Sequence, residues 1–332
     1  MSKEAKRVIV AGGCGFIGSN FLILMVNKYP NYQFINIDKL TYSGNQENLK
    51  QIENQSNYAF IQADIANYDF MRNIIQEGDV IVNFAAESHV DNSIKEPQIF
   101  IQTNVLGTHS ILEAARQKKA GLFVQISTDE VYGSLNFGDA SSKEQDVLNP
   151  SSPYSASKAA AEMICLGNIK TFKQPIIITR SSNNFGPYHF PEKVVPLFIT
   201  NLIEQKKVPL YGTGKNVRDW IFVQDNCEAI DFIIHNGQVN GVYNIGGGNE
   251  ITNIGLTKLI LEKMGAGEES IQLVEDRKGH DLRYSLNCEK IKALGWKPRF
   301  NFDKALSLTI EWYKNNKWWW QPLKNMPGRR TS

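Results

Sequence analysis

The chain has 332 residues, of which 42% are hydrophobic and 21% charged, a composition that indicates a folded protein and excludes a disordered one. Its formal net charge is only +2 and the basic residues are scattered, so nucleic acid is not expected as a partner. No apolar run has the length of a membrane span or of a signal-peptide core, and the four cysteines form no CxxC pair. We therefore expect a cytoplasmic protein without a disulfide framework or a metal site.

Short β-branched runs alternate with helical stretches through the first half of the chain. The expected strands and helices lie at residues 7–11, 17–27, 33–38, 58–63, 80–85, 104–118, 121–127 and 176–180. This alternation predicts an α/β fold of Rossmann type, a doubly wound parallel sheet with helices on both faces. Because the chain is long for one core, we predict a Rossmann domain at 1–185, with a return segment at about 218–247, and a smaller α/β domain at 186–332.

The first expected strand runs into GGCGFIG at residues 12–18, and a helical pattern follows. The order of strand, glycine turn and helix is typical of a dinucleotide site. Gly12, Gly15 and Gly18 let the backbone approach a pyrophosphate, and the helix N-terminus, with Phe16 and Ile17, offers N–H groups to it. The spacing is G-x-x-G-x-x-G, and taken alone these glycines could also form only a tight turn.

The second expected strand ends at Asp38, twenty positions after Gly18, where a carboxylate can accept hydrogen bonds from the adenosine ribose hydroxyls. The same carboxylate would repel a 2′-phosphate, so NAD is favoured over NADP, although Lys39 follows directly and could soften that preference. Asp64 and Ile65 follow the next strand and are placed to meet the adenine, but an aspartate there is also a common turn former. The fourth strand ends beside the expected cofactor with Phe84, Ala85 and Ala86.

Tyr154 and Lys158 are four positions apart in an expected helix, which places their side chains on one face. A lysine ammonium lowers the pKa of a neighbouring tyrosine, and the phenolate can remove a hydroxyl proton while hydride leaves the same carbon. This spacing also occurs by chance in many helices. Here, however, the pair follows the glycine loop and also follows Ser127 and Thr128, which lie at a strand end. Chance is therefore a poor explanation.

Eight segments together resemble the extended short-chain dehydrogenase/reductases, and among them the nucleotide-sugar 4,6-dehydratases, over nearly the whole chain. They are GGCGFIG (12–18), DKLTY (38–42), AAESHVD (85–91), STDEVYG (127–133), YSASK (154–158), NNFGPYHFPEK (183–193), RDW (218–220) and DRKGHD (276–281). The departures from the family pattern are Cys14, Asn92 and Lys278. The resemblance implies bound NAD and dehydration of dTDP-glucose to dTDP-4-keto-6-deoxyglucose, an early step towards rhamnose and other deoxysugars.

The acid pair Asp129 and Glu130 distinguishes a dehydratase from the other enzymes that share the glycine loop and the tyrosine–lysine pair. Removing water across C5 and C6 of a hexose needs a base and an acid, and two carboxyl groups in different environments can divide that work. The resemblance implies that Tyr154 deprotonates the C4 hydroxyl held by Thr128, Glu130 takes the C5 proton and Asp129 protonates the C6 oxygen. Taken alone, the pair could be a solvated strand-to-loop junction.

Arg218 follows a glycine-containing turn and is a candidate for the diphosphate, since guanidinium groups match phosphate oxygens. The resemblance adds further residues, each of which alone could be an ordinary solvated side chain. For NAD they are Leu40, Thr41, Ser88, Thr103 and Asn184, together with Tyr154 and Lys158. For the substrate they are Ser88, Thr128, Asn183, Lys193, Val194, Pro209, Tyr211, Asn253, Arg277 and His280. One methyl group is worth only about 1–3 kcal/mol of discrimination, so thymidine and uridine both stay open.

Two alternatives to the dehydratase remain. One is a nucleotide-sugar 4-epimerase, which would not depend on the acid pair. The other is a non-catalytic NAD-binding regulator, which would have no reason to retain all five catalytic candidates.

The helices at 104–118 and 155–170 carry apolar residues on more than one face. They are expected to form a homodimer, although core packing would explain the pattern nearly as well. The aromatic end of the chain, with Trp312, Tyr313 and Trp318 to Trp320, is expected to pack on the body of the protein, with an interface as the alternative.

Overall fold

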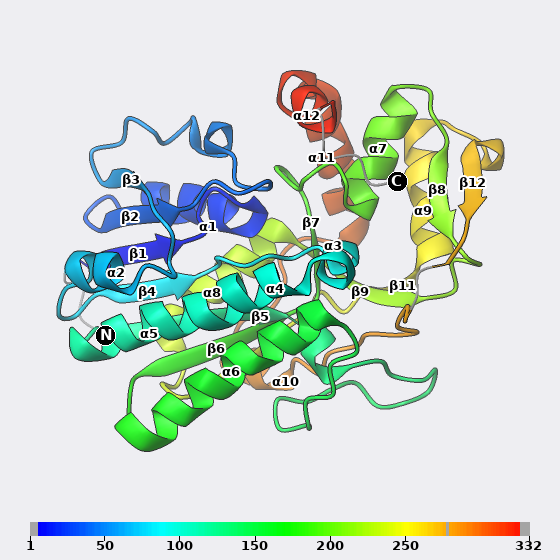
Figure 1. Cartoon of the computed structure of the whole chain (residues 1–332). Coiled ribbons are helices and arrows are strands. Elements are labelled where there is room, and N and C mark those ends of the chain that lie inside the picture. Colours follow the sequence, from blue (N-terminus) through cyan, green and yellow to red (C-terminus); the bar gives the residue numbers. More distant parts are fainter. Residues whose placement is uncertain (1–5, 277–278, 326–332) are drawn as a thin grey trace.

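A computed structural model of the chain describes residues 6–276 and 279–325 (Figure 1). Its centre is a sheet of seven strands in which every neighbouring pair is parallel. In spatial order the strands are β10 (Val242–Ile245), β6 (Ile176–Ser181), β5 (Leu122–Thr128), β4 (Val80–Asn83), β1 (Arg7–Ala11), β2 (Gln33–Asp38) and β3 (Tyr58–Gln62). The predicted doubly wound Rossmann-type sheet is therefore confirmed.

Two layers of helices cover the sheet because its central strands are apolar on both faces. Val8 and Val10 of β1 pack in one core with α1 (Phe16–Lys28) and α8 (Val223–Asn236). Ile9 and Ala11 pack on the opposite face. The helices on or beside that face are α2 (Tyr68–Ile74), α3 (Val90–Lys95), α4 (Pro97–Phe100), α5 (Thr108–Gln117) and α6 (Pro153–Phe172). The expected helix at 104–118 begins as a π-helix, η2 (Ile101–Gly107), which α5 continues.

The second half of the chain builds a smaller unit to the right of the large sheet in Figure 1. Three strands lie in the order β11 (Glu250–Thr252), β9 (Val217–Phe222) and β7 (Asn183–Phe185), and β8 (Val208–Tyr211) pairs with β12 (Ile271–Val274). The accompanying helices are α7 (Val194–Ile203), α9 (Asn253–Met264), α11 (Phe302–Asn315) and α12 (Lys317–Lys324). Their apolar faces form a separate core that contains Phe198, Leu306 and Trp320.

The chain returns to the large sheet more than once. Helix α8 packs on α1 and β10 extends the sheet beside β6, whereas β9 stays in the smaller sheet with β7 and β11. A later segment with α10 (Glu289–Ala293) and Trp296 also packs into the α1–α8 core. Within the described ranges, no helix is long and apolar enough to cross a membrane.

Candidate functional site

A hollow of about 780 Å³ lies at the carboxyl ends of the central strands, between the large sheet and the smaller unit. Ligands of open α/β sheets bind in such a position, because the loops that follow the strands converge there. Most of the sequence-predicted residues line it, from both halves of the chain. They are Gly12, Gly15, Phe16, Ile17, Gly18, Phe84, Ala86, Ser88, Thr128, Asp129, Glu130, Tyr154, Lys158, Asn183, Asn184, Lys193, Val194, Pro209, Tyr211, Arg218, Asn253 and His280.

The glycine loop ends β1 and starts α1 in the conformation that a dinucleotide site needs. Gly12 has φ +77°, and a Cβ there would lie 2.5 Å from the backbone nitrogen of Ala85. A Cβ on Gly18 would lie 2.3 Å from the carbonyl oxygen of Gly12. A Cβ on Gly15 would meet nothing closer than that same oxygen, at 3.4 Å. Gly12 and Gly18 are thus required by the fold, whereas Gly15 leaves the N-terminus of α1 open to a ligand.

This difference predicts distinct effects of adding one methyl group. Gly15→Ala is expected to change the free energy of unfolding by less than about 1 kcal/mol, since Gly15 is extended with φ −77°. It should weaken NAD binding about tenfold, because the methyl group would stand where a pyrophosphate approaches. Gly18→Ala should instead destabilise the fold by about 1–3 kcal/mol through the clash with Gly12. Urea denaturation and NAD titration of both variants test this pair, and equal behaviour of the two would contradict it.

Eight residues that are expected to bind the cofactor are not in the lining of the hollow. They are Asp38, Lys39, Leu40, Thr41, Asp64, Ile65, Ala85 and Thr103. Asp38 ends β2, and its carboxylate accepts the backbone N–H groups of Cys14 at 2.9 Å and Leu40 at 2.8 Å. Burial raises the pKa of Asp38, and these two hydrogen bonds oppose the rise. The Nζ of Lys39 lies 2.7 Å from the Asp64 carboxylate, so the positive charge of Lys39 forms an ion pair with Asp64.

Three of the expected residues have positions or surroundings that the sequence did not describe. Ile65 is buried in the core with α2 and α5, and its side chain lies against Gly107. Thr103 lies in the π-helix η2 and is half-buried. Arg277 lies outside the described residues.

Tyr154 and Lys158 share the buried face of α6 at its first turns. The helix starts there because Ser152 and Ser155 form a reciprocal capping box and Pro153 occupies the first turn. Lys158 Nζ donates a 2.6 Å hydrogen bond to the carbonyl oxygen of Ile126 in β5, and burial lowers its pKa to about 8.

The surroundings of Tyr154 oppose the lowering of its pKa that its spacing to Lys158 predicts. Burial raises the pKa of Tyr154 far above its ordinary value, Glu130 adds to the rise, and the hydroxyl of Thr128 opposes it. These groups favour the neutral phenol. A buried phenol becomes a phenolate only when further positive charge is brought beside it.

The two acidic residues after β5 occupy different environments. Asp129 is 3% exposed, and the hydroxyl of Thr128 donates to its Oδ1 at 3.3 Å. Its Oδ2 is buried without a hydrogen-bond partner in the described chain. Glu130 is half-buried. Burial raises the pKa of Asp129 well above its ordinary value, Glu130 and Asp219 add to the rise, and Arg218 opposes it. These surroundings favour the protonated form of Asp129, which is the form that a proton donor needs.

The opposite wall of the hollow comes from the smaller unit. Arg218 on β9 is 8% exposed, and its guanidinium lies 4.3 Å from the ring centre of Tyr284. Its Nη2 donates to the carbonyl oxygen of Asp281 at 3.0 Å. Lys193 caps α7 and its Nζ donates to the carbonyl oxygen of Ser88 at 3.2 Å. Two fixed cations therefore face the hollow from the smaller unit, as recognition of a diphosphate requires.

Several lining residues received no role from the sequence. His89 and Glu192 are both buried, with Nε2 and Oε1 3.8 Å apart, and the ring of His189 stacks on Phe16 at 4.1 Å. Tyr284 also lines the hollow. The two histidines and Glu192 lie inside segments that carry the family resemblance. No spacing rule connects them, because they meet only through the tertiary fold.

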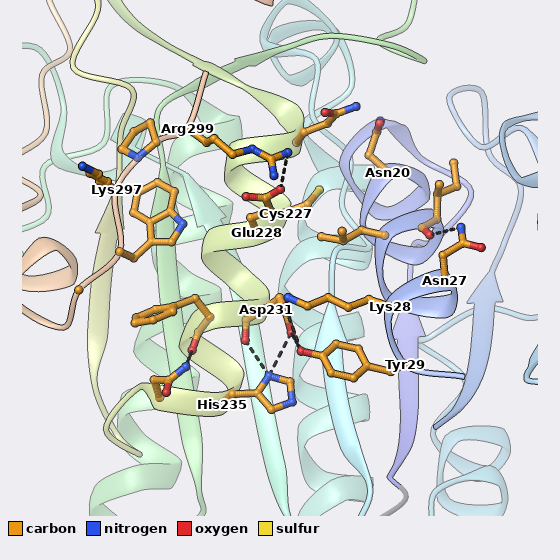
Figure 2. Close-up of a pocket in the computed structure, with 18 residues that line it drawn as sticks. Asn20, Asn27, Lys28, Tyr29, Cys227, Glu228, Asp231, His235, Lys297 and Arg299 are labelled. Carbon is orange, nitrogen blue, oxygen red and sulfur yellow. Dashed lines mark hydrogen bonds and ion pairs between the residues drawn. The ribbon is translucent and has the colours of Figure 1, made fainter. Parts of the chain in front are cut away.

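A second hollow, of about 1000 Å³, lies outside this site between α1, α8 and residues 295–299 (Figure 2). Five of its charged or titratable side chains form two groups. Asp231 is 2.6 Å from Lys28 Nζ and 3.0 Å from His235 Nδ1, and Arg299 is 2.9 Å from Glu228. None of the sequence-predicted site residues lines it. We interpret this cluster as a stabilising contact between α1 and α8.

The cluster predicts a pH-dependent contribution to stability. Burial favours a higher pKa for Asp231, but His235 and Lys28 outweigh it and hold the pKa of Asp231 below its ordinary value of 3.8. A carboxyl whose pKa is lowered on folding stabilises the protein above pH 3.8, and this contribution is lost as the pH falls through the lower folded value. Asp231→Asn is therefore expected to cost about 1–3 kcal/mol at pH 7 and less in acid.

Urea midpoints of the wild type and Asp231→Asn, at pH 7 and at the lowest pH where both fold, test this expectation. Asp69→Asn is the matched control, because Asp69 is 80% exposed and lies 3.9 Å from Arg72 in a surface pair. The expectation would be contradicted if the difference in urea midpoint between wild type and Asp231→Asn were as large in acid as at pH 7.

Comparison with known proteins agrees with this arrangement. A family model described as GDP-mannose 4,6 dehydratase matches residues 9–309. A dTDP-glucose 4,6-dehydratase from Streptomyces niveus is 45% identical over 324 residues, which cover 96% of each chain. The crystal structure of a dTDP-glucose 4,6-dehydratase from Streptomyces venezuelae, with NAD and dTDP bound, has a TM-score of 0.92 at 43% identity and covers 96% of this chain and 100% of that one.

A more distant neighbour is the UDP-glucose 4-epimerase from Thermotoga maritima, solved with UDP-glucose. It has a TM-score of 0.85 at 28% identity and covers 93% of this chain and 99% of its own. The fold is thus shared with epimerases, while the sequence is nearer to the dehydratases. The chain belongs to the family of nucleotide-sugar 4,6-dehydratases and, within it, groups with the dTDP-glucose 4,6-dehydratases.

Proposed function

We propose that the chain catalyses the NAD-dependent dehydration of dTDP-glucose to dTDP-4-keto-6-deoxyglucose. The reaction comprises oxidation at C4, loss of water across C5 and C6, and reduction at C6. One observation carries the proposal: Asp129, buried in surroundings that raise the pKa of its carboxyl, lies next to a half-buried Glu130 in the same hollow as Tyr154. The relatives that bear the name of this enzyme support it.

The residues present fit NAD. The open backbone at Gly15 and the N-terminus of α1 would hold the pyrophosphate, Asp38 the adenosine ribose, and Asn184 the nicotinamide end. The Oδ1 of Asn184 is a buried acceptor without a partner in the described residues, which suits a ligand donor. When bound, oxidised NAD supplies a hydride acceptor and a positive charge that favours the tyrosine phenolate.

Tyr154 then removes the proton of the C4 hydroxyl, which Thr128 holds. Lys158, with its pKa of about 8, is mostly protonated at pH 7 and stabilises the phenolate. The new 4-keto group makes the hydrogen on C5 acidic. Glu130, the more accessible of the two acids, takes this proton, and the neutral Asp129 gives its proton to the departing C6 oxygen. Water leaves. Hydride returned to C6 would complete the methyl group while Glu130 gives its proton back to C5, and the proton that Tyr154 took from the C4 hydroxyl balances the one that Asp129 gave.

We assign the nucleotide sugar to the wall formed by the smaller unit. The proposed division is an NAD-binding domain at 1–185, with a return segment at about 218–247, and a nucleotide-sugar-binding domain at 186–332. Arg218 and Lys193 would bind the diphosphate. Tyr211, which lies edge-on to His280 with ring centres 6.4 Å apart, would contact the base. Further contacts are assigned to Ser88, Asn183, Val194, Pro209, Asn253 and His280.

A 4-epimerase is the second candidate, because a neighbour at TM-score 0.85 has that activity in its name. One experiment separates the two. The purified protein is incubated with dTDP-glucose, without added cofactor, and the nucleotide sugar is analysed by mass spectrometry and NMR. Loss of one water supports the dehydratase and shows that the protein carries NAD. An unchanged mass with inverted C4 supports the epimerase, and unchanged substrate with UDP-glucose as well as dTDP-glucose contradicts both.

The expected homodimer and cytoplasmic location complete the proposal. Support for the dimer comes from large apolar side chains that are 44–53% exposed on and beside the two expected helices: Ile94, Ile99, Ile101, Leu106, Met163 and Phe172. These belong to α3, α4, η2 and α6, and exposed large apolar side chains are a common feature of subunit contacts. Analytical ultracentrifugation would decide between a dimer and a monomer.

A further inference from the structure

The aromatic C-terminal helix α12 contains two buried tryptophans that use their indole N–H groups differently. Trp319 is 3% exposed and Trp320 is 1% exposed. Trp320 Nε1 donates to the carbonyl oxygen of Tyr313 in α11 at 2.8 Å, so this bond stays within the C-terminal helix pair. Trp319 Nε1 donates at 2.7 Å to the side-chain oxygen of Asn48, 271 positions earlier in the chain. In Figure 1, α12 lies on the same side of the molecule as the segment after β2 that contains Asn48.

Asn48 connects this contact to the glycine loop. It lies in the short helix η1 (Gln46–Leu49) and is 1% exposed. Its amide oxygen accepts the Trp319 bond, and its Nδ2 donates at 3.0 Å to the carbonyl oxygen of Cys14. The two bonds use opposite ends of one planar amide. Because the side-chain amide of Asn48 is planar, the indole that holds its oxygen also fixes the direction in which its Nδ2 donates.

Cys14 is the residue between Gly13 and Gly15, so its two peptide groups form the centre of the loop. Its carbonyl belongs to the same planar unit as the N–H of Gly15. Asn48 and the backbone N–H of Asn45, at 3.0 Å, hold that carbonyl. The N–H of Cys14 is held by the carboxylate of Asp38 at 2.9 Å. Two successive peptide planes are therefore fixed from outside the loop, by Asn48 on one side and Asp38 on the other.

A second set of contacts connects α12 to the start of α1 through residues 187–188. The ring of Trp319 lies 5.6 Å from that of Tyr188. The carbonyl of the preceding residue, Pro187, accepts a 3.0 Å hydrogen bond from Asn20 Nδ2 on α1. The C-terminal helix therefore reaches both ends of the region that would hold the pyrophosphate: the loop through Asn48 and the first turns of α1 through residues 187–188.

We propose that Trp319 is a positioning residue for the cofactor: through Asn48 it holds the Cys14 carbonyl, and with it the glycine loop, in the conformation that binds NAD. The C-terminal helix of the substrate half thereby contributes to cofactor retention without touching the cofactor. This inference rests on the proposed function, because it requires that the loop binds NAD.

The test compares Trp319→Phe with Trp320→Phe, in the full-length protein as purified. Each variant keeps an aromatic ring in a buried position of α12 and loses one indole hydrogen bond. The exchange of bound NAD for labelled NAD is measured, together with the thermal midpoint of each protein. Trp319→Phe is expected to speed the exchange about tenfold, as loss of one buried hydrogen bond to an amide would allow, whereas Trp320→Phe leaves it unchanged within about twofold.

Two further readouts separate positioning from general destabilisation. With saturating NAD, the KM for dTDP-glucose and kcat of Trp319→Phe should return to the wild-type values. Asn48→Ala should also speed the exchange, and adding Trp319→Phe to it should have no further effect, because both act through the same contact. Asn48→Ala provides the test if Trp319→Phe does not fold.

The outcomes are distinguishable from failure of the proposed function. If the wild type neither carries nor binds NAD, the proposed function fails first. Two results with a wild type that carries NAD would overturn the inference and leave α12 with a packing role only. The first is that Trp319→Phe and Trp320→Phe exchange NAD at the same rate. The second is that the effects of Trp319→Phe and Asn48→Ala on the exchange rate add in the double variant.

Discussion

Replacement of Tyr154 by phenylalanine is expected to lower kcat for dTDP-glucose by about 10³-fold, within the range for loss of a positioned acid–base group. The ring of Tyr154 packs edge-on to that of Phe100 with centres 6.3 Å apart, and phenylalanine keeps that contact, so the fold should be little changed. Only the hydroxyl that removes the C4 proton is lost. Product formation by the purified variant, with its NAD content measured in parallel, gives the result.

Tyr132→Phe is the matched control. Tyr132 is also buried, and its hydroxyl donates at 2.8 Å to Asn244, but it does not line the hollow. Losing this hydroxyl should lower stability by about 1–3 kcal/mol while kcat stays within about twofold. If Tyr154→Phe and Tyr132→Phe retained similar activity, the assignment of Tyr154 as the base at C4 would be wrong.

Asp129→Asn and Glu130→Gln are expected to lower the overall rate by about 10²-fold or more each, and to stop the reaction at different points. Both variants keep Tyr154 and should still oxidise C4, so the absorbance of reduced nicotinamide should accumulate in a single turnover. Glu130→Gln should lose the exchange of the C5 hydrogen with deuterium from the solvent. Asp129→Asn should keep that exchange, because only the proton for the departing oxygen is missing.

Asp139→Asn serves as the control for removing an acid, since Asp139 lies in an exposed loop outside the hollow. Neither the exchange nor the rate should change in this variant. Full dehydratase activity in Asp129→Asn or Glu130→Gln would show that the elimination uses other groups. Loss of exchange in both variants would show that the two carboxyl groups do not divide the work as proposed.

The Rossmann sheet and the main motifs could be predicted because they are encoded in short stretches of sequence. Residues 7–18 contain strand, glycine turn and helix start in one run, and the structure has β1, the loop and α1 in those places. Tyr154 and Lys158 share a face because helical geometry requires it at a spacing of four. The acid at the end of β2 likewise follows from the end of an apolar run. Periodicity and backbone sterics act locally, so these features need no knowledge of distant contacts.

Properties that depend on burial or on distant partners could not be predicted. The sequence could not show that Asp64 engages Lys39, or that burial makes Tyr154 a weaker acid than its lysine neighbour would suggest. The residue types alone do not show that the fold buries Asp129 and leaves Glu130 half-buried. The pKa of a side chain follows the solvation and charges around it, which chain neighbours alone do not define.

The sequence by itself thus determined the class of fold, the dinucleotide loop and the residue types of the site, because each is fixed by interactions within a few positions. Tertiary structure alone decided which chain segments meet. It placed β9 in the smaller sheet, brought the cations Lys193 and Arg218 opposite the acid pair, and joined Trp319 to Asn48 across 271 positions. Such contacts form because burying apolar helices around two cores brings distant residues together, and no local pattern records which of them will meet.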